Sequence, residues 1–220
     1  MTGKRIRGLL CVLLLVCCLT GCGDFDAKGY VQASLDAVFQ GETESLMNLQ
    51  DGSSKSALNK AYKENIAGFA EGLTEGLDVS EATQLQFQML CENIFRTMRY
   101  QVEEAEKLSS KEYHVKVTYA PSDVFLKWAE YLTENAIDIQ KRADAGEYQG
   151  TEEEVQEQIQ QDIAAESLEL LDTAMLHAAY GEEESVVLTV KEGENGDFAL
   201  DEEEIADFTV KILCLDEILG

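Results

Sequence analysis

The hydrophobic period of this chain changes sharply near residue 100. Before that point apolar side chains recur every three or four residues, as they do over 58–73, which is typical of amphipathic helices. From Tyr113 to Tyr119 apolar and polar side chains alternate instead, which is the period of a half-buried strand. A chain that carries both periods has to pack helices against a sheet, and this requirement constrains the fold more than any single residue does.

Helical periodicity and helix-start residues predict several further elements. Ser80 and Ser122 are predicted N-caps, and Thr151 with Glu154 has the spacing of a capping box. Asp201 is predicted to cap a last helix that runs to residue 219, although 209–215 could instead form a strand. The predicted helices cover residues 27–40, 44–49, 58–73, 81–98, 123–145, 152–175 and 202–219.

The alternating segments predict a small sheet. A hairpin is expected from 100–102 and 113–119 around the polar tip at 107–110, a strand at 185–190, and a short return strand at Phe198 and Leu200. Strands joined by hairpins form antiparallel sheets. The predicted fold class is therefore α+β and helix-dominant, with several amphipathic helices packed on a small antiparallel sheet of three to four strands.

The first residues have the pattern of an export signal. Lys4, Arg5 and Arg7 precede an uncharged apolar run from Leu9 to Leu19. A run of this length is shorter than the roughly 20 residues that span a bilayer. We therefore expect a cleaved leader rather than a permanent transmembrane helix.

The end of this leader resembles the lipobox of bacterial lipoprotein precursors, in the residues Leu19, Thr20, Gly21 and Cys22. The resemblance implies cleavage before Cys22 and a diacylglyceryl group on its sulfur. It also implies localisation at the extracytoplasmic face of the cell membrane, with the protein held by lipid. The predicted layout is a signal peptide at 1–21, a lipidated N-terminus and short tether at 22–28, and one α+β extracytoplasmic domain at 29–220.

The net charge limits the partners of this domain. The whole chain carries −26, and loss of the three basic leader residues leaves 14 basic against 43 acidic side chains, or −29. Such a surface is repelled by anionic headgroups and by nucleic acid phosphates. The predicted partners are the membrane, through the lipid on Cys22, and an unknown small ligand or envelope protein. Nucleic acid is excluded.

Neither a metal nor a cofactor is predicted. His114 and His177 lack the spacing of a zinc helix and are expected at the surface or at a helix end. The acidic runs do not fit an EF-hand loop, because aligning Gly196 with its glycine puts Lys191 at the first ligand. Cys91 and Cys214, the two cysteines beyond Cys22, could form a bridge or could lie unpaired in the core.

Five aromatic residues gather around the predicted hairpin and the helix after it. We predict that they border a possible cleft for a small ligand or glycan, with membership of the core as the alternative. The five are Tyr100, Tyr113, Tyr119, Trp128 and Tyr131.

Catalytic motifs give little support for an enzyme. The sequence contains no GxSxG and no glycine-rich phosphate loop. The leading hypothesis is a non-catalytic module that binds a ligand or a protein. The alternative is a hydrolase directed at cell wall or glycan that uses paired carboxylates, since 43 acidic residues always include some pair at a workable distance. The catalytic residues of such an enzyme are unknown.

The mature chain resembles uncharacterised surface lipoproteins of Gram-positive bacteria. The resemblance lies in residues 27–37, in Gly41 after that helix, and in Tyr180-Gly181-Glu182 before the late strand. It implies the same surface location and a single-domain layout, and it implies no activity.

Overall fold

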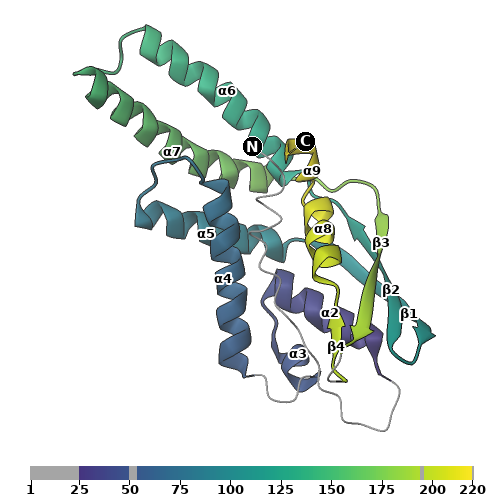
Figure 1. Ribbon diagram of the computed structural model, residues 1–220. Helices are drawn as coiled ribbons and strands as arrows, with labels where there is room; N and C mark the ends of the chain where they lie inside the picture. Colours follow the sequence, from purple (N-terminus) through teal and green to yellow (C-terminus); the bar gives the residue numbers. More distant parts are fainter. Residues whose placement is uncertain (1–24, 50–53, 194–195, 220) are drawn as a thin grey trace.

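The computed structural model describes residues 25–49, 54–193 and 196–219 (Figure 1). The four strands pair antiparallel in the order β1-β2-β3-β4. The helices and strands are α2 (Ala27–Leu35), the π-helical turn η1 (Asp36–Gln40), α3 (Glu44–Leu49), α4 (Lys55–Leu73), α5 (Glu81–Arg96), β1 (Arg99–Ser109), β2 (Glu112–Ala120), α6 (Val124–Asp144), α7 (Glu152–His177), β3 (Glu184–Glu192), β4 (Phe198–Leu200), α8 (Glu202–Ile212) and α9 (Asp216–Leu219).

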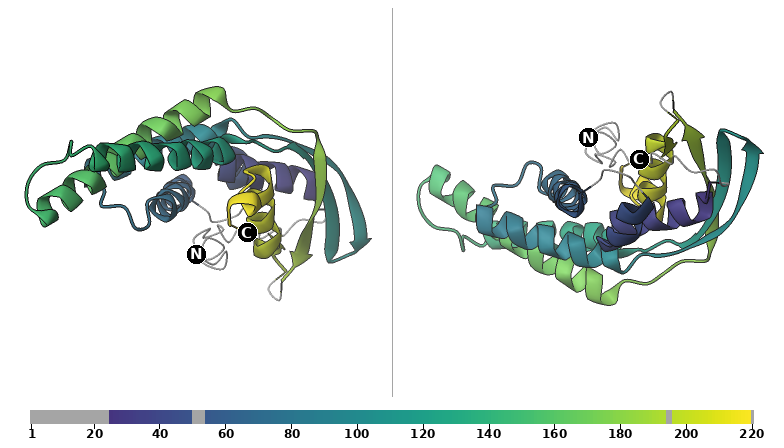
Figure 2. Two further views of the ribbon diagram at one scale, coloured as in Figure 1. Left: turned by 90° about the horizontal axis from the view of Figure 1, so that it is seen from above. Right: turned by 90° about the horizontal axis from the view of Figure 1, so that it is seen from below.

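The predicted fold class is confirmed: the fold is α+β and helix-dominant, with one small antiparallel sheet. Helices α2 and α8 lie against the same face of the sheet (Figures 1 and 2). Helices α6 and α7 form an antiparallel hairpin at the end of the molecule opposite the tip of β1 and β2 (Figure 1). The molecule is therefore elongated, with a sheet end and a helical end.

The sheet has one buried and one open face, as the alternation predicts. Val115 and Leu188 are paired across β2 and β3, and both are buried against the helices. Lys116 and Val187, one residue further along the two strands, are paired on the other face and are exposed. A shift of register by one residue would exchange these faces, so burial specifies the register.

The core joins the N-terminal helix, the sheet and the C-terminal helix through aromatic rings. The Phe39 ring lies 5.8 Å from Phe95, 5.5 Å from Tyr100 and 5.8 Å from Phe208, measured between ring centres. Phe208 is also in edge contact with Tyr119 of β2. Ring pairs at these separations add to the free energy gained by burying their apolar area.

Three of the predicted helix starts are confirmed. Ser80 accepts a hydrogen bond from the Thr83 N–H, and Asp201 accepts from the backbone at the start of α8. Thr151 and Glu154 form both bonds of a capping box before α7. Each cap satisfies backbone donors that have no partner inside the helix.

The predicted cap at Ser122 is wrong. The N-cap of α6 is Asp123, whose side chain makes no capping bond, and the Ser122 hydroxyl is buried without a hydrogen-bond partner. Ser122 instead forms an isolated bridge with Tyr180, and its N–H donates to the Ile212 carbonyl. Ser122 thus lies one residue before the cap, where its backbone joins the start of α6 to two distant segments.

The end of the chain also departs from prediction. The segment 209–215 is not a strand, and the predicted continuous helix breaks between α8 and α9. Cys214 adopts a left-handed backbone with φ of 51°, while Leu213 and Leu215 on either side are buried. Burial of both leucines requires a sharp turn that a continuous helix does not allow.

The fold begins within the predicted tether. Phe25 stacks on Phe198 with 4.0 Å between ring centres and lies 5.5 Å from the Tyr113 ring. Asp26 caps α2, and Ala27 is buried. The N-terminus of the described chain is therefore packed near the tip of the β1–β2 hairpin.

Candidate functional site

Two of the five predicted cleft residues lie together in the sheet. Tyr100 and Tyr119 are cross-strand partners in β1 and β2. The Tyr100 hydroxyl donates to Asp36 at 2.7 Å, and the Tyr119 hydroxyl donates to Glu184 at 2.9 Å. Both tyrosines therefore link the sheet by hydrogen bonds to acidic side chains. Both also border a hollow on the surface of the molecule.

The other three predicted cleft residues lie elsewhere. Tyr113 is buried in the aromatic cluster with Phe25 and Phe198. Trp128 is buried at the base of the α6–α7 hairpin, where its indole N–H donates to the Ser167 carbonyl at 2.9 Å. Tyr131 lines a different hollow on the same hairpin. The five residues thus belong to separate parts of the surface and core, and their role in ligand binding stays a prediction.

The hollow that Tyr100 and Tyr119 border is here named the sheet hollow. It has a volume of about 680 Å³ and is lined by the start of β1, the end of β2 and residues 180–185. The Arg99 guanidinium lies 3.7 Å above the centre of the Tyr180 ring. The Tyr180 hydroxyl donates to the Thr97 carbonyl at 2.7 Å, which holds the ring in place beneath the arginine.

Two cations of the sheet hollow stand out in so acidic a protein. Arg99 and Lys116 both line it, and within the described chain neither forms an ion pair. Their neighbours Glu103 and Glu184 are hydrogen-bonded to Thr118 and Tyr119 instead. The lining of the sheet hollow is therefore polar, with charges of both signs from Arg99, Lys116, Glu103, Glu183 and Glu184, and it could hold a small polar ligand.

The two tyrosines make stability sensitive to alkaline pH. Burial, and then the hydrogen bond to a carboxylate, raises the pKa of Tyr100 and of Tyr119 well above the usual value. The unfolded chain loses these hydroxyl protons near pH 10. The two tyrosines therefore contribute fully to the free energy of unfolding below pH 10, and this contribution is lost as the pH rises above 10. We expect urea denaturation to show a falling free energy of unfolding above pH 10. Tyr100→Phe and Tyr119→Phe should each flatten that fall, whereas an unchanged slope would contradict this assignment.

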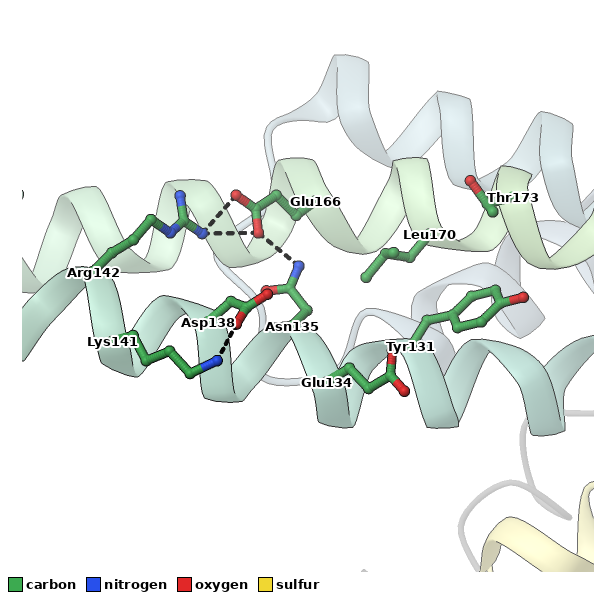
Figure 3. Close-up of a pocket in the computed structure, with 9 residues that line it drawn as sticks. All are labelled: Tyr131, Glu134, Asn135, Asp138, Lys141, Arg142, Glu166, Leu170 and Thr173. Atoms are coloured by element: carbon green, nitrogen blue, oxygen red, sulfur yellow. Dashed lines mark hydrogen bonds and ion pairs between the residues drawn. The ribbon is translucent and has the colours of Figure 1, made fainter.

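A second hollow, of about 650 Å³, lies along the α6–α7 hairpin and is here named the hairpin pocket (Figure 3). Arg142 of α6 binds Glu166 of α7 with one nitrogen, at 2.7 and 3.0 Å, and Asp162 with the other at 3.1 Å. Asn135 donates to Glu166 at 2.6 Å. These side chains face one another across the two helices, so the network fastens the hairpin together.

One carboxyl of the hairpin pocket has its pKa shifted away from the range that an acid catalyst needs. The hydrogen bond and charge of Lys141 lower the pKa of the exposed Asp138 carboxyl. A glycosidase acid needs the opposite shift, because it must stay protonated near neutral pH. Nothing in this pocket favours the paired-carboxylate hydrolase, which stays a prediction.

Sequence reasoning missed the Arg142 network. An antiparallel hairpin folded about 146–150 brings Arg142 near Asp162 and Glu166 on the following helix. The sequence therefore indicates an ion pair, since a basic residue precedes Gly146 and acidic residues follow Gly150. Which acid pairs with Arg142 depends on how far the two helices are offset along their axes.

A third hollow, here named the apolar groove, lies between α6, α7 and the end of α4. It has a volume of about 460 Å³, and its lining includes Trp128, Leu132, Ile139 and Ile163. Asn135 lines both this groove and the hairpin pocket.

The histidines lie far from a metal-binding arrangement. His114 is half-buried on the open face of β2, opposite Thr189, and His177 is exposed at the end of α7. Over residues 25–49, 54–193 and 196–219, no three His, Cys, Asp or Glu side chains gather as they would around a metal ion.

Cys91 and Cys214 are both free, so the bridge left open by the sequence is not formed. Burial raises the pKa of the Cys91 thiol to about 12 and, with nearby acids, that of Cys214 to about 11. Because the thiolate is the reactive form, we expect Cys214 to react with Ellman's reagent at pH 8 about a hundredfold more slowly than a free thiol. Cys91 should react only after unfolding. Rapid labelling of either thiol in the native protein would contradict this.

The predicted lipidation site and lipobox, Leu19 to Cys22, lie outside the described residues. None of the described helices is long and apolar enough to span a membrane.

Comparisons with known proteins show a structural similarity but no family. No family model matches the chain, and no curated protein matches it. Among solved structures, it is similar to the crystal structure of YcdA from Bacillus subtilis, a candidate lipoprotein, with 13% sequence identity and a TM-score of 0.45. The similarity covers 84% of this chain and 54% of YcdA, so the chain spans about half the length of that protein.

Proposed function

We propose that this protein is a membrane-anchored extracytoplasmic lipoprotein whose single domain is a non-catalytic binding module. The leader carries this proposal. A basic start, an uncharged apolar run over 9–19 and Leu19-Thr20-Gly21-Cys22 follow one another in the order of an exported lipoprotein precursor. The three features occupy the first 22 residues and share no other evident purpose.

A lipid on Cys22 is a sufficient anchor by itself. One acyl chain gives only marginal membrane binding, whereas two hold a protein stably. A diacylglyceryl group supplies both chains on one sulfur. The charge of −29 on the mature chain opposes further contact with anionic lipid, so attachment depends on this group.

The packing of Phe25 orients the domain on such an anchor. Only Gly23 and Asp24 lie between Cys22 and Phe25, so the Cα atoms of Cys22 and Phe25 can be at most about 11 Å apart. Phe25 lies against Tyr113 and Phe198, close to the tip of β1 and β2. The sheet end therefore faces the membrane, and the α6–α7 hairpin at the opposite end points away from it (Figure 1).

The surface of the domain supports a binding role. The sheet hollow presents Arg99 and Lys116 beside Glu103, Glu183 and Glu184, and the apolar groove lies on the hairpin that points outward. Acid–base chemistry has no comparable support in the pockets described above.

Metabolic labelling with a fatty acid analogue tests the anchor. The wild-type protein should carry the label and fractionate with membranes, and in intact cells without an outer membrane it should be open to added protease. Cys22→Ala should remove the label and the mature membrane form, whereas Cys91→Ala should keep both. Label that persists in Cys22→Ala, or an unlabelled wild-type protein in the cytosol, would overturn the proposal.

A further inference from the structure

The sheet hollow has an uncharged floor that crosses three strands. Thr118 of β2 is paired with Gln101 of β1 on one side and with Ser185 of β3 on the other, and all three residues line the hollow. Ala120 is the next residue of β2 on the same open face, because successive side chains of a strand alternate between its faces. Two strand spacings of about 4.8 Å make this floor about 10 Å wide.

Arg99 stands at the β1 side of the floor and is held there by Tyr180. The Tyr180 backbone is bridged to Ser122, and the N–H of the next residue, Gly181, donates to the Pro121 carbonyl at 2.8 Å. The Tyr180 hydroxyl is bonded to a carbonyl at the end of α5, so both ends of this residue are fixed. A guanidinium stacked on a ring keeps the N–H groups at its edge available for two parallel hydrogen bonds to a carboxylate.

Glu183 supplies the opposite charge at the β3 side of the floor. It directly precedes β3 and lines the hollow, and within the part of the chain that the structure describes it has no hydrogen bond or ion pair. The other two acids of the hollow, Glu103 and Glu184, already accept hydrogen bonds from hydroxyl groups of β2. Because Arg99 is stacked on Tyr180, it and Glu183 line the same hollow without neutralising each other.

We propose that the sheet hollow binds a short peptide with free termini, with the peptide carboxylate on Arg99 and the terminal ammonium on Glu183. A group of each sign on either side of an uncharged floor complements a zwitterion, whereas a simple anion or a simple cation would meet a like charge. An extended peptide covers at most about 3.6 Å per residue, so two or three residues match a floor about 10 Å wide. This inference names the ligand class of the proposed binding module and rests on that function.

The orientation proposed above leaves the sheet hollow open to such a ligand. The hollow lies at the start of β1 and the end of β2, away from the tip that joins these strands. The nine residues of β2 extend about 30 Å. The tip faces the membrane in that orientation, so the hollow lies well clear of the lipid.

Trialanine is the probe, because its side chains are uncharged and its two termini carry the recognition. The experiment titrates the mature protein, purified from membranes in nonionic detergent, with trialanine by isothermal titration calorimetry. We expect saturable binding at one site that weakens as salt increases. N-acetyltrialanine and trialanine amide each lack one terminal charge and should bind at least about fivefold more weakly. Free alanine should also bind at least about fivefold more weakly, because it is too short to reach both charged groups.

Two matched pairs of variants assign the two termini. Arg99→Gln removes the positive charge from the hollow, and Arg96→Gln removes the same charge from an exposed site outside it. Glu183→Gln and Glu182→Gln form the second pair, since Glu182 is exposed and does not line the hollow. Arg99→Gln and Glu183→Gln should each weaken trialanine binding at least about fivefold, whereas their controls should change it less than about twofold.

The capped peptides show which charge meets which terminus. Arg99→Gln should not further weaken trialanine amide, which has no carboxylate, and Glu183→Gln should not further weaken N-acetyltrialanine, which has no ammonium. The comparison of capped and uncapped peptides uses the wild-type protein, so this part of the test does not depend on how a variant folds.

Four results would overturn the inference. They are the absence of saturable trialanine binding, equal affinity for trialanine and its two capped forms, equal affinity for trialanine and free alanine, and equal weakening by the two members of either variant pair. The contacts proposed for the peptide do not involve the lipid. The same titration with Cys22→Ala protein therefore separates failure of this inference from failure of the anchor.

Discussion

Replacement of Phe39 by alanine is expected to lower the free energy of unfolding by about 3–5 kcal/mol. Phe39 is fully buried, and its ring contacts Phe95 of α5, Tyr100 of β1 and Phe208 of α8. Truncation leaves a cavity where three elements meet, so neighbouring side chains can fill it only partly. Domains of this size are typically stable by about 5–15 kcal/mol, so the variant should lose a large part of its stability.

Urea denaturation followed by far-UV circular dichroism measures this loss. Leu176→Ala is the matched control, because Leu176 is 72% exposed on α7 and its truncation leaves no cavity. The control should stay within about 0.5 kcal/mol of wild type. A Phe39→Ala variant that loses less than about 1 kcal/mol would mean that the three elements do not share this core.

Replacement of Gly41 by alanine should cost about 2–3 kcal/mol. Gly41 ends the first helical segment with φ of 70°, a left-handed backbone that alanine adopts at a cost. An added Cβ would also lie 2.8 Å from Cε1 of Tyr62, which is buried. Backbone strain and steric overlap therefore act at the same position.

Gly146 separates these two causes. It has nearly the same backbone, with φ of 73°, but no atom lies within 4 Å of an added Cβ. Gly146→Ala should therefore show only the conformational cost, about 1 kcal/mol. Thermal or urea denaturation of the two variants gives the difference. Equal losses would show that the Tyr62 side chain moves aside without cost.

The parts of the fold that local patterns determine were predictable. Gly41 was predicted to end the first helix, and it does so after a π-helical turn that no sequence pattern indicated. The capping box of Thr151 and Glu154 and the alternation from Tyr113 to Tyr119 also reappear in the structure. In each case residues close in sequence determine the result. They supply the hydrogen bonds at a helix end, or they set which face of a strand is apolar and buried.

The errors and omissions arise where distant segments meet. Ser122 does not cap α6: it lies one residue before the cap, and its backbone pairs with Tyr180, 58 residues later. Arg99 stacks on Tyr180 in the sheet hollow, a contact that depends on how β3 joins the sheet. The predicted aromatic cleft shows the same difficulty, since closeness in sequence placed Tyr119 and Trp128 together while the structure puts them in different surroundings.

The mass of the N-terminal peptide of the protein purified from membranes tests the proposed attachment most directly. The expected peptide begins at Cys22, lacks residues 1–21 and carries the added mass of a diacylglyceryl group on the sulfur. A peptide that begins with the basic leader and contains an unmodified thiol at position 22 would contradict the attachment and the orientation derived from it.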